Sequence, residues 1–127
     1  MARGKIVKGK IEIRVKRAYD KPSSEDGFRV LVDRLWPRGV SKERAKIDLW
    51  ARELAPSDKL RRWFAHDPLK WEEFKARYAE ELRANKAKVM EFVRILREKK
   101  KVTLVYSARD KERNNAVALA SFLRKFA

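Results

Sequence analysis

The chain has no cysteine and a single histidine, His66. The absence of cysteine excludes disulfide bonds, thiolate nucleophiles and Cys-ligated metals, and one histidine without cysteine does not make a conventional zinc site. The sequence therefore predicts no metal and no cofactor. Neither a P-loop nor the glycine fingerprint of a dinucleotide-binding domain is present.

Long apolar runs are also missing. No stretch approaches the roughly 20 apolar residues of a membrane span, and residues 1–16 contain no apolar segment of the kind found in a signal peptide. A cytoplasmic protein that makes no membrane contact is therefore the expectation.

Acidic residues are scarce relative to basic ones. The 127-residue chain carries 34 Lys and Arg against 18 Asp and Glu, a formal net charge of +16. The excess is concentrated in residues 1–21 and 83–101, each of which holds eight basic and two acidic residues. Such a field attracts polyanions, nucleic acid above all. The alternative is a thermophile-like surface rich in Lys, Arg and Glu, which the absence of Gln supports.

The length fits a single domain over residues 1–127, with a basic extension at about residues 1–10, and 44% hydrophobic residues suffice for a core. Apolar and basic residues alternate over 7–17, which predicts a strand with one buried face. Its basic face either tracks phosphates or protects a sheet edge from pairing with other chains. Two short apolar runs, 30–32 and 102–106, predict buried strands.

Most of the remaining pattern is helical. Apolar residues recur at spacings of three and four over 68–82, 86–98 and 115–126, and Ser57 is a suitable N-cap for a helix over 58–65. Residues 43–54 fit a strand or a helix, and we expect a short helix followed by an extended piece. Long helical excursions between strands imply parallel neighbours. The predicted fold is thus an α/β three-layer sandwich with a small, mostly parallel sheet and helices on both faces.

Both buried strands end in arginine-rich loops, at residues 34–38 and 109–113. If the strands are parallel neighbours, these loops meet at the rim of the sheet where open α/β folds bind ligands. Guanidinium groups and a helix start would then converge on a phosphate or carboxylate small molecule. The candidate anion-binding residues are Arg34, Arg38, Ser107, Arg109, Arg113, Asn114 and Asn115. A second, compatible interpretation is that Asp33 and Asp110 pair with the arginines and brace the loops.

Four further residues are candidates for lining such a pocket, namely Asp33, Trp36, His66 and Tyr106. Histidine is the residue type that ordinarily exchanges protons near neutrality, although a lone histidine in a turn more often bonds the backbone. Trp36 lies within the rim loop, and Tyr106 ends a buried strand and points into the core or the crevice. Asn114 and Asn115 also suit the cap of the last helix.

Four blocks of the sequence are similar to a known family: RAYD (17–20), DGFRVLVDRLWPRGVSKERAKIDLW (26–50), ELAPSDKLRRWFAHDPLKWEEFKARYAEEL (53–82) and VTLVYSARDKERNNAVAL (102–119). They resemble the family called domain of unknown function 488, in its short YeaO-like branch. The resemblance covers nearly the whole chain after about Glu12. It implies an α/β fold and a cytosolic microbial protein, and it implies no activity, because none is settled for the family.

The expected topology is also similar to that of rhodaneses and low-molecular-weight phosphatases, in which a cysteine lies in a loop between a strand and a helix. Residues 107–114 would form that loop here, and they hold no cysteine, so sulfur transfer and cysteine phosphatase chemistry are excluded. The hypothesis we favour is an uncharacterised protein with an anion site at the rim. The alternatives are a nucleic-acid-binding accessory protein and a partner-binding domain without a small ligand.

Overall fold

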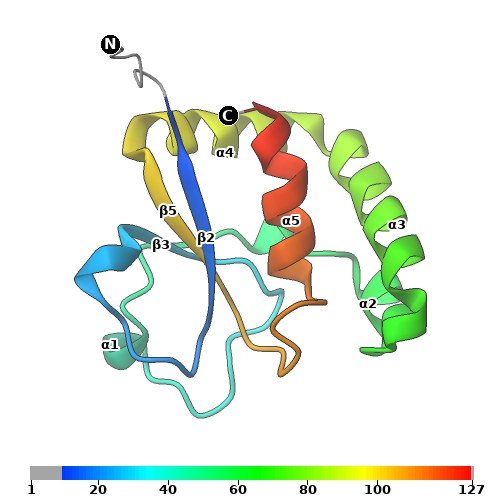
Figure 1. The fold of residues 1–127 in the computed structure, drawn as a ribbon, viewed down its shortest axis with the longest axis horizontal. Coiled ribbons are helices and arrows are strands. Elements are labelled where there is room, and N and C mark those ends of the chain that lie inside the picture. Colours follow the sequence, from blue (N-terminus) through cyan, green and yellow to red (C-terminus); the bar gives the residue numbers. More distant parts are fainter. Residues whose placement is uncertain (1–9, 127) are drawn as a thin grey trace.

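A computed structural model describes residues 10–126 of the chain (Figure 1). The basic extension expected at residues 1–10 lies almost entirely outside this range. The strands are β2 (Glu12–Arg17), β3 (Phe28–Leu31), β4 (Leu49–Trp50) and β5 (Lys101–Tyr106). The α-helices are α1 (Lys42–Ala45), α2 (Asp58–Phe64), α3 (Trp71–Ala84), α4 (Lys86–Lys99) and α5 (Asn115–Leu123). Short 3-10 turns are η1 (Ser24–Asp26), η2 (Arg52–Leu54), η3 (Pro68–Lys70) and η4 (Arg124–Phe126).

The four described strands form one sheet in the order β2-β5-β3-β4, and every pair is parallel. The two strongly apolar strands, β3 and β5, are neighbours with Val30 opposite Leu104 and Leu31 opposite Val105. This confirms the α/β fold and the parallel arrangement expected from the helical excursions between the strands. Both strands therefore deliver their following loops to the same rim of the sheet.

The first face of the sheet is apolar and packs against α4 and α5, and α3 packs against these two helices (Figure 1). Side chains point to alternate faces of a strand, and this face receives Ile13, Val30, Val102 and Leu104, all in the main core. Helix α3 presents an aromatic stripe at three- and four-residue spacing, as predicted, with Phe74 and Tyr78 almost fully buried.

The second face is covered by short elements, η1 and α1 (Figure 1). Its apolar cluster is small, comprising Ala18, Leu31 and Val105. Gly27, which follows η1, has φ +65°, and a Cβ there would lie 2.4 Å from the carbonyl oxygen of Lys101. The close approach of η1 to β5 therefore requires glycine.

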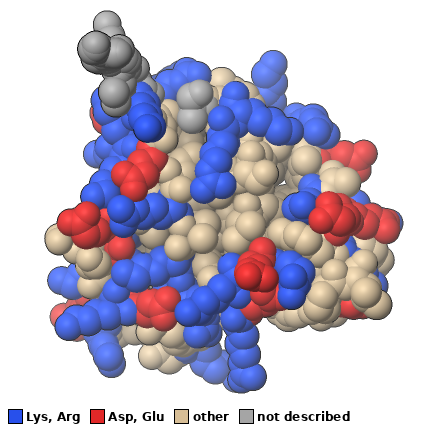
Figure 2. Space-filling model, viewed as in Figure 1, with Lys and Arg blue, Asp and Glu red and all other residues tan. Residues whose placement is uncertain are grey.

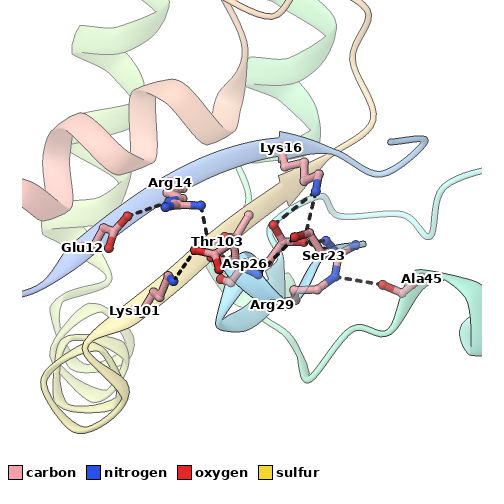
Figure 3. Close-up of polar contacts among 10 residues, drawn as sticks. Glu12, Arg14, Lys16, Ser23, Asp26, Arg29, Ala45, Lys101 and Thr103 are labelled. Atoms are coloured by element: carbon pink, nitrogen blue, oxygen red, sulfur yellow. Dashed lines mark hydrogen bonds and ion pairs between the residues drawn. The ribbon is translucent and has the colours of Figure 1, made fainter. Parts of the chain in front are cut away.

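A group of charges, two of them buried, completes the second face, and we call Lys16, Asp26 and Arg29 the Asp26 cluster (Figure 3). The Asp26 carboxylate accepts hydrogen bonds from Arg29 Nη1 at 2.7 Å, the Ser23 amide at 2.9 Å and Lys16 Nζ at 3.2 Å. Burial by itself would raise the pKa of Asp26, but the Ser23 amide and the two cations outweigh burial, and the pKa lies below its ordinary value. The charges of β2 thus serve the fold in part, because Lys16 reaches a partner on the second face.

The helix starts follow from their caps. Ser57 Oγ accepts a hydrogen bond from the Leu60 amide, and Asn114 Oδ1 accepts one from the Val117 amide. Asp67, which precedes Pro68, accepts one from the Leu69 amide.

The ambiguous stretch 43–54 contains the end of the short helix α1, the two-residue strand β4 and the turn η2. The expected short helix and extended piece are both found, but the extended piece ends in the 3-10 turn η2 before Pro56. No helix within residues 10–126 has the length and apolar character needed to cross a membrane.

Candidate functional site

A cavity of about 640 Å³ lies at the carboxyl ends of β3 and β5. We call it the rim cavity. Three stretches of the chain supply most of its wall: residues 33–38 after β3, residues 107–110 with the start of α5 after β5, and residues 55–74 around α2. Its lining residues are Tyr19, Asp33, Arg34, Leu35, Trp36, Pro37, Arg38, Ala55, Pro56, Arg61, Phe64, His66, Phe74, Ser107, Ala108, Arg109, Asp110, Asn114 and Asn115.

The Asp33 carboxylate joins the ends of the two central strands. One oxygen accepts from the Ser107 amide at 3.0 Å and from the Ser107 hydroxyl at 2.6 Å. The other oxygen accepts from Asn115 Nδ2 at 3.0 Å, an amide that also donates to the Val32 carbonyl. Ser107 and Asn115, both expected to bind an external anion, therefore already hold a carboxylate of the chain itself.

The loop between β5 and α5 satisfies its own donors in the same way. Asp110 accepts from the amides of Glu112 and Arg113 at 2.9 and 3.1 Å, and these two hydrogen bonds lower its pKa below the ordinary value. Its other oxygen lies 3.2 Å from Arg113 Nε. The predicted bracing thus occurs between Asp110 and Arg113, whereas Asp33 is braced by a serine and an asparagine.

Three arginines of the lining have no such partner. Within residues 10–126, no carboxylate oxygen lies within 4 Å of the guanidinium groups of Arg34, Arg38 and Arg109. Arg34 donates to the Pro56 carbonyl at 3.3 and 3.4 Å, near the limit for a hydrogen bond. The fourth lining arginine, Arg61, pairs with Asp58. The hydrogen bond that Arg61 donates to Asp58, with smaller contributions from the charges of Arg62 and Arg34, lowers the pKa of Asp58.

Aromatic side chains fix the loop after β3. Trp36 donates its indole N–H to the Val40 carbonyl at 2.6 Å, and its ring meets that of Trp50 edge to face with centroids 5.5 Å apart. Tyr19 donates its hydroxyl to the Arg38 carbonyl at 2.9 Å. The Trp50 indole donates to the Asp33 carbonyl at the start of this loop, so hydrogen-bonded rings hold the loop that carries Arg34 and Arg38 at both ends.

His66 enters the lining through an unusual turn. Helix α2 ends at Phe64, and both Ala65 and His66 then adopt left-handed backbone angles, with φ of 46° and 58°. Consecutive left-handed residues other than glycine are uncommon and cost conformational energy. The turn brings the imidazole to the rim cavity, where its ring centroid lies 6.2 Å from that of Phe64.

The structure gathers most of the residues singled out from the sequence around one cavity. Asp33, Arg34, Trp36, Arg38, His66, Ser107, Arg109, Asn114 and Asn115 line it. It places two others elsewhere: Arg113 pairs with Asp110 outside the lining, and the Tyr106 ring belongs to the main core, where burial raises its pKa. In the wall formed by residues 55–74, sequence reasoning singled out His66 and missed the other lining residues. The one signal for this wall was the stretch WFAHDP (63–68) within the family resemblance.

Within the described residues 10–126, no three His, Asp or Glu side chains gather as metal ligands would. The side chains that line the rim cavity instead carry guanidinium groups, aromatic rings and carboxylates that are already hydrogen-bonded within the chain. Fold and cavity together define a small parallel α/β protein with an arginine-rich pocket at the carboxyl rim of its sheet.

The chain belongs to a family of uncharacterised proteins. Residues 12–126 match the family described as DUF488-N3i, "Inactive DUF488-N3 subclade", which confirms the resemblance to domain of unknown function 488. The chain is 40% identical over 111 residues to the uncharacterized protein Rv3073c of Mycobacterium tuberculosis (strain H37Rv), a match that covers 87% of this chain and 92% of that protein. It is 38% identical over 114 residues to the uncharacterized protein YeaO of Escherichia coli K12, covering 90% and 98% respectively. No solved structure matches the chain.

Proposed function

We propose that the rim cavity binds a small anion, a phosphate or a carboxylate, without chemical turnover. The observation that carries this proposal is that Arg34, Arg38 and Arg109 all line one cavity. No carboxylate oxygen of the described chain lies within 4 Å of their guanidinium groups. Unpaired guanidinium groups repel one another, and an anion between them removes that repulsion and satisfies their N–H donors.

The carboxylates of the lining leave this positive charge available. Asp33 is saturated by Ser107 and Asn115, and Asp110 is held by two amides and Arg113. Both acidic groups therefore have partners other than the three arginines. A guanidinium group offers a planar pair of N–H donors that matches the spacing of phosphate or carboxylate oxygens. Each charge-assisted hydrogen bond contributes about 1.5–3 kcal/mol to such a complex.

Binding without turnover fits the state of the loop at 107–114. In this loop the amides of Ser107, Glu112 and Arg113 already donate to Asp33 and Asp110. They are unavailable as preorganised donors for a transition state, which is the role that such amides play in acyl or phosphoryl transfer. The description of the matching subclade as inactive agrees with this assignment.

The test is calorimetric titration of the protein with phosphate and with acetate at low ionic strength. Arg34→Ala and Arg109→Ala should each weaken binding at least about tenfold, the equivalent of one charge-assisted hydrogen bond. Arg94→Ala is the matched control, because Arg94 is exposed on α4, makes no ion pair within residues 10–126 and lies outside the cavity. Equal weakening by all three substitutions would mean general charge attraction and would contradict the proposal.

A second candidate function is nucleic-acid binding through α4 and its flanks. Seven exposed basic residues lie between positions 83 and 100, and none forms an ion pair with a carboxylate of residues 10–126: Arg83, Lys86, Lys88, Arg94, Arg97, Lys99 and Lys100. Figure 2 shows Lys and Arg spread over much of the viewed face, with acidic side chains confined to separate clusters.

The salt dependence of oligonucleotide binding tests this second candidate function. Each phosphate neutralised by a basic side chain releases about one counterion, so affinity for a duplex oligonucleotide should fall steeply between 50 and 200 mM salt. Replacing Lys88 and Arg94 with glutamate should flatten that slope, whereas Arg34→Ala should not. Absence of micromolar binding at the lowest salt would contradict the candidate and would favour the thermophile-like interpretation of the charge.

A further inference from the structure

We infer that the ligand of the rim cavity is an anion carried on a flat apolar group, as in an aryl phosphate, rather than a free inorganic anion. This inference rests on the proposed function and adds the chemical class of the ligand. It comes from three properties of the cavity that the arginines alone do not explain: its size, the chemistry of its walls and the fixed position of Trp36.

The size of the cavity exceeds the needs of a free anion. Its volume is about 640 Å³. A tetrahedral oxyanion displaces only a few water volumes of about 30 Å³ each. Cavities of about 300–1,000 Å³ are typical of sites that enclose an organic molecule. Most of the space therefore remains for a part of the ligand that the arginines do not contact.

The walls of that remaining space are apolar. Nine hydrophobic or proline residues line the cavity beside the arginines, among them Leu35, Trp36, Pro37, Pro56 and Phe64. Leu35 is 66% exposed at the rim, although most large apolar side chains of the described chain are covered. Solvated apolar surface in a concave site gains free energy when an apolar group covers it. The cavity therefore complements a ligand with a charged end and an apolar end.

Trp36 makes the apolar wall rigid before any ligand arrives. Its N–H bonds the Val40 carbonyl, its ring packs against Trp50, and the Trp50 indole in turn donates to the Asp33 carbonyl at 2.8 Å. Immobilised rings lose little further entropy on binding. Stacking on an aromatic side chain contributes about 1–3 kcal/mol for a planar ring, or roughly 5- to 150-fold in affinity. A planar group next to the anion matches this wall better than a flexible aliphatic chain.

The experiment compares three probes by calorimetry: inorganic phosphate, phenyl phosphate and phenol. Phenyl phosphate should bind at least about tenfold more tightly than phosphate, and phenol should bind more weakly than phenyl phosphate because it lacks the anion. In a proton–nitrogen NMR titration, the indole N–H of Trp36 should shift with phenyl phosphate and not with phosphate. Arg34→Ala should weaken phosphate and phenyl phosphate by the same factor.

Two variants test the apolar wall separately. Trp36→Leu should bring the ratio of the affinities for phenyl phosphate and phosphate close to one, and the ratio is the readout because any loosening of the loop that carries Arg34 and Arg38 weakens both probes. Leu35→Ser provides the same comparison at an exposed position where folding is unaffected, and it decides the matter if Trp36→Leu does not fold. Equal affinities for phosphate and phenyl phosphate in the natural protein would overturn this inference and leave the proposed function standing. Binding of neither would overturn both.

Discussion

Two groups of basic residues, the Asp26 cluster and the arginines of the rim cavity, differ in how their charge is neutralised. In the Asp26 cluster, Arg29 is 3% exposed and is paired with a carboxylate that is 4% exposed, and Lys16 completes the group (Figure 3). Arg34, Arg38 and Arg109 line the rim cavity, and no carboxylate oxygen of the described chain lies within 4 Å of their guanidinium groups. The first group has its carboxylate within the chain, whereas our proposal supplies the second group with a bound anion.

This difference assigns separate roles to residues of the same type. Breaking a buried pair strands a charge in a medium of low polarity, so the Asp26 cluster should affect folding. Unpaired charges around a cavity contribute little to stability and can even oppose it, which is the usual cost of a binding site. The following predictions compare the two groups, beginning with the largest expected effect.

Asp26→Ala should cost about 3–5 kcal/mol of unfolding free energy, because it leaves the buried guanidinium of Arg29 without its carboxylate. Arg29 Nη2 already lacks a hydrogen-bond acceptor within residues 10–126, so the substitution adds to an existing deficit. Urea denaturation at pH 7 measures the change. Glu12→Ala is the control, since it breaks an ion pair with Arg14 in which both side chains are about half exposed, and it should cost at most about 1 kcal/mol. Similar losses in both variants would contradict the distinction.

Asp33→Ala should have an intermediate effect of about 1–3 kcal/mol, because the Ser107 amide, the Ser107 hydroxyl and Asn115 Nδ2 lose their acceptor. The carboxylate is an internal anion, so an external one should replace it. Added formate or acetate should recover part of the lost stability in Asp33→Ala and should have no such effect on Asp26→Ala, whose site is closed to solvent. Thermal denaturation with and without the added anion measures both. Equal recovery, or none, in the two variants would show that Asp33 does not occupy an anion-accepting position.

Much of this arrangement was predictable, and the remainder depends on contacts between distant residues. The caps Ser57, Asp67 and Asn114 lie within a few residues of the amides they accept, and the parallel pairing of β3 with β5 follows from the helices between them. Local pattern could therefore predict the helices, the sheet and the rim. It could not predict that Ser107 and Asn115 would be taken by Asp33, because those partners are 74 and 82 positions away.

Arg29 shows a second limit of sequence reasoning. It follows Phe28 and precedes an apolar run, a position from which an arginine normally reaches solvent. Its burial depends on η1, which bends back over the sheet at Gly27 and places Asp26 beside it. The partner lies three positions away, but only the backbone of the turn brings it onto the same face of the sheet.

Acidification should weaken the Asp26 cluster. The pKa of Asp26 is lower in the folded protein than its ordinary value, so its ionised form stabilises the fold at pH values above the ordinary pKa of about 4. That contribution is lost as the pH falls below about 4 toward the lowered pKa. Unfolding free energies measured at pH 7 and pH 3 should therefore differ more in the natural protein than in Asp26→Asn, which has no carboxylate to protonate. If the unfolding free energy changes equally between pH 7 and pH 3 in both proteins, carboxylates other than Asp26 cause the acid sensitivity.

Removal of a rim arginine should have the smallest effect on stability and the largest effect on binding. Arg38→Ala and Arg109→Ala should each change the unfolding free energy by no more than about 0.5 kcal/mol, as expected for exposed side chains without an ion pair. Any change should be toward greater stability, because each substitution removes repulsion from the neighbouring cations. The same variants should lose affinity for phosphate in calorimetry, so that stability and binding respond in opposite directions. A loss of stability comparable to that of Asp26→Ala would mean that the rim arginines brace the loops, and the contrast between the two groups would disappear.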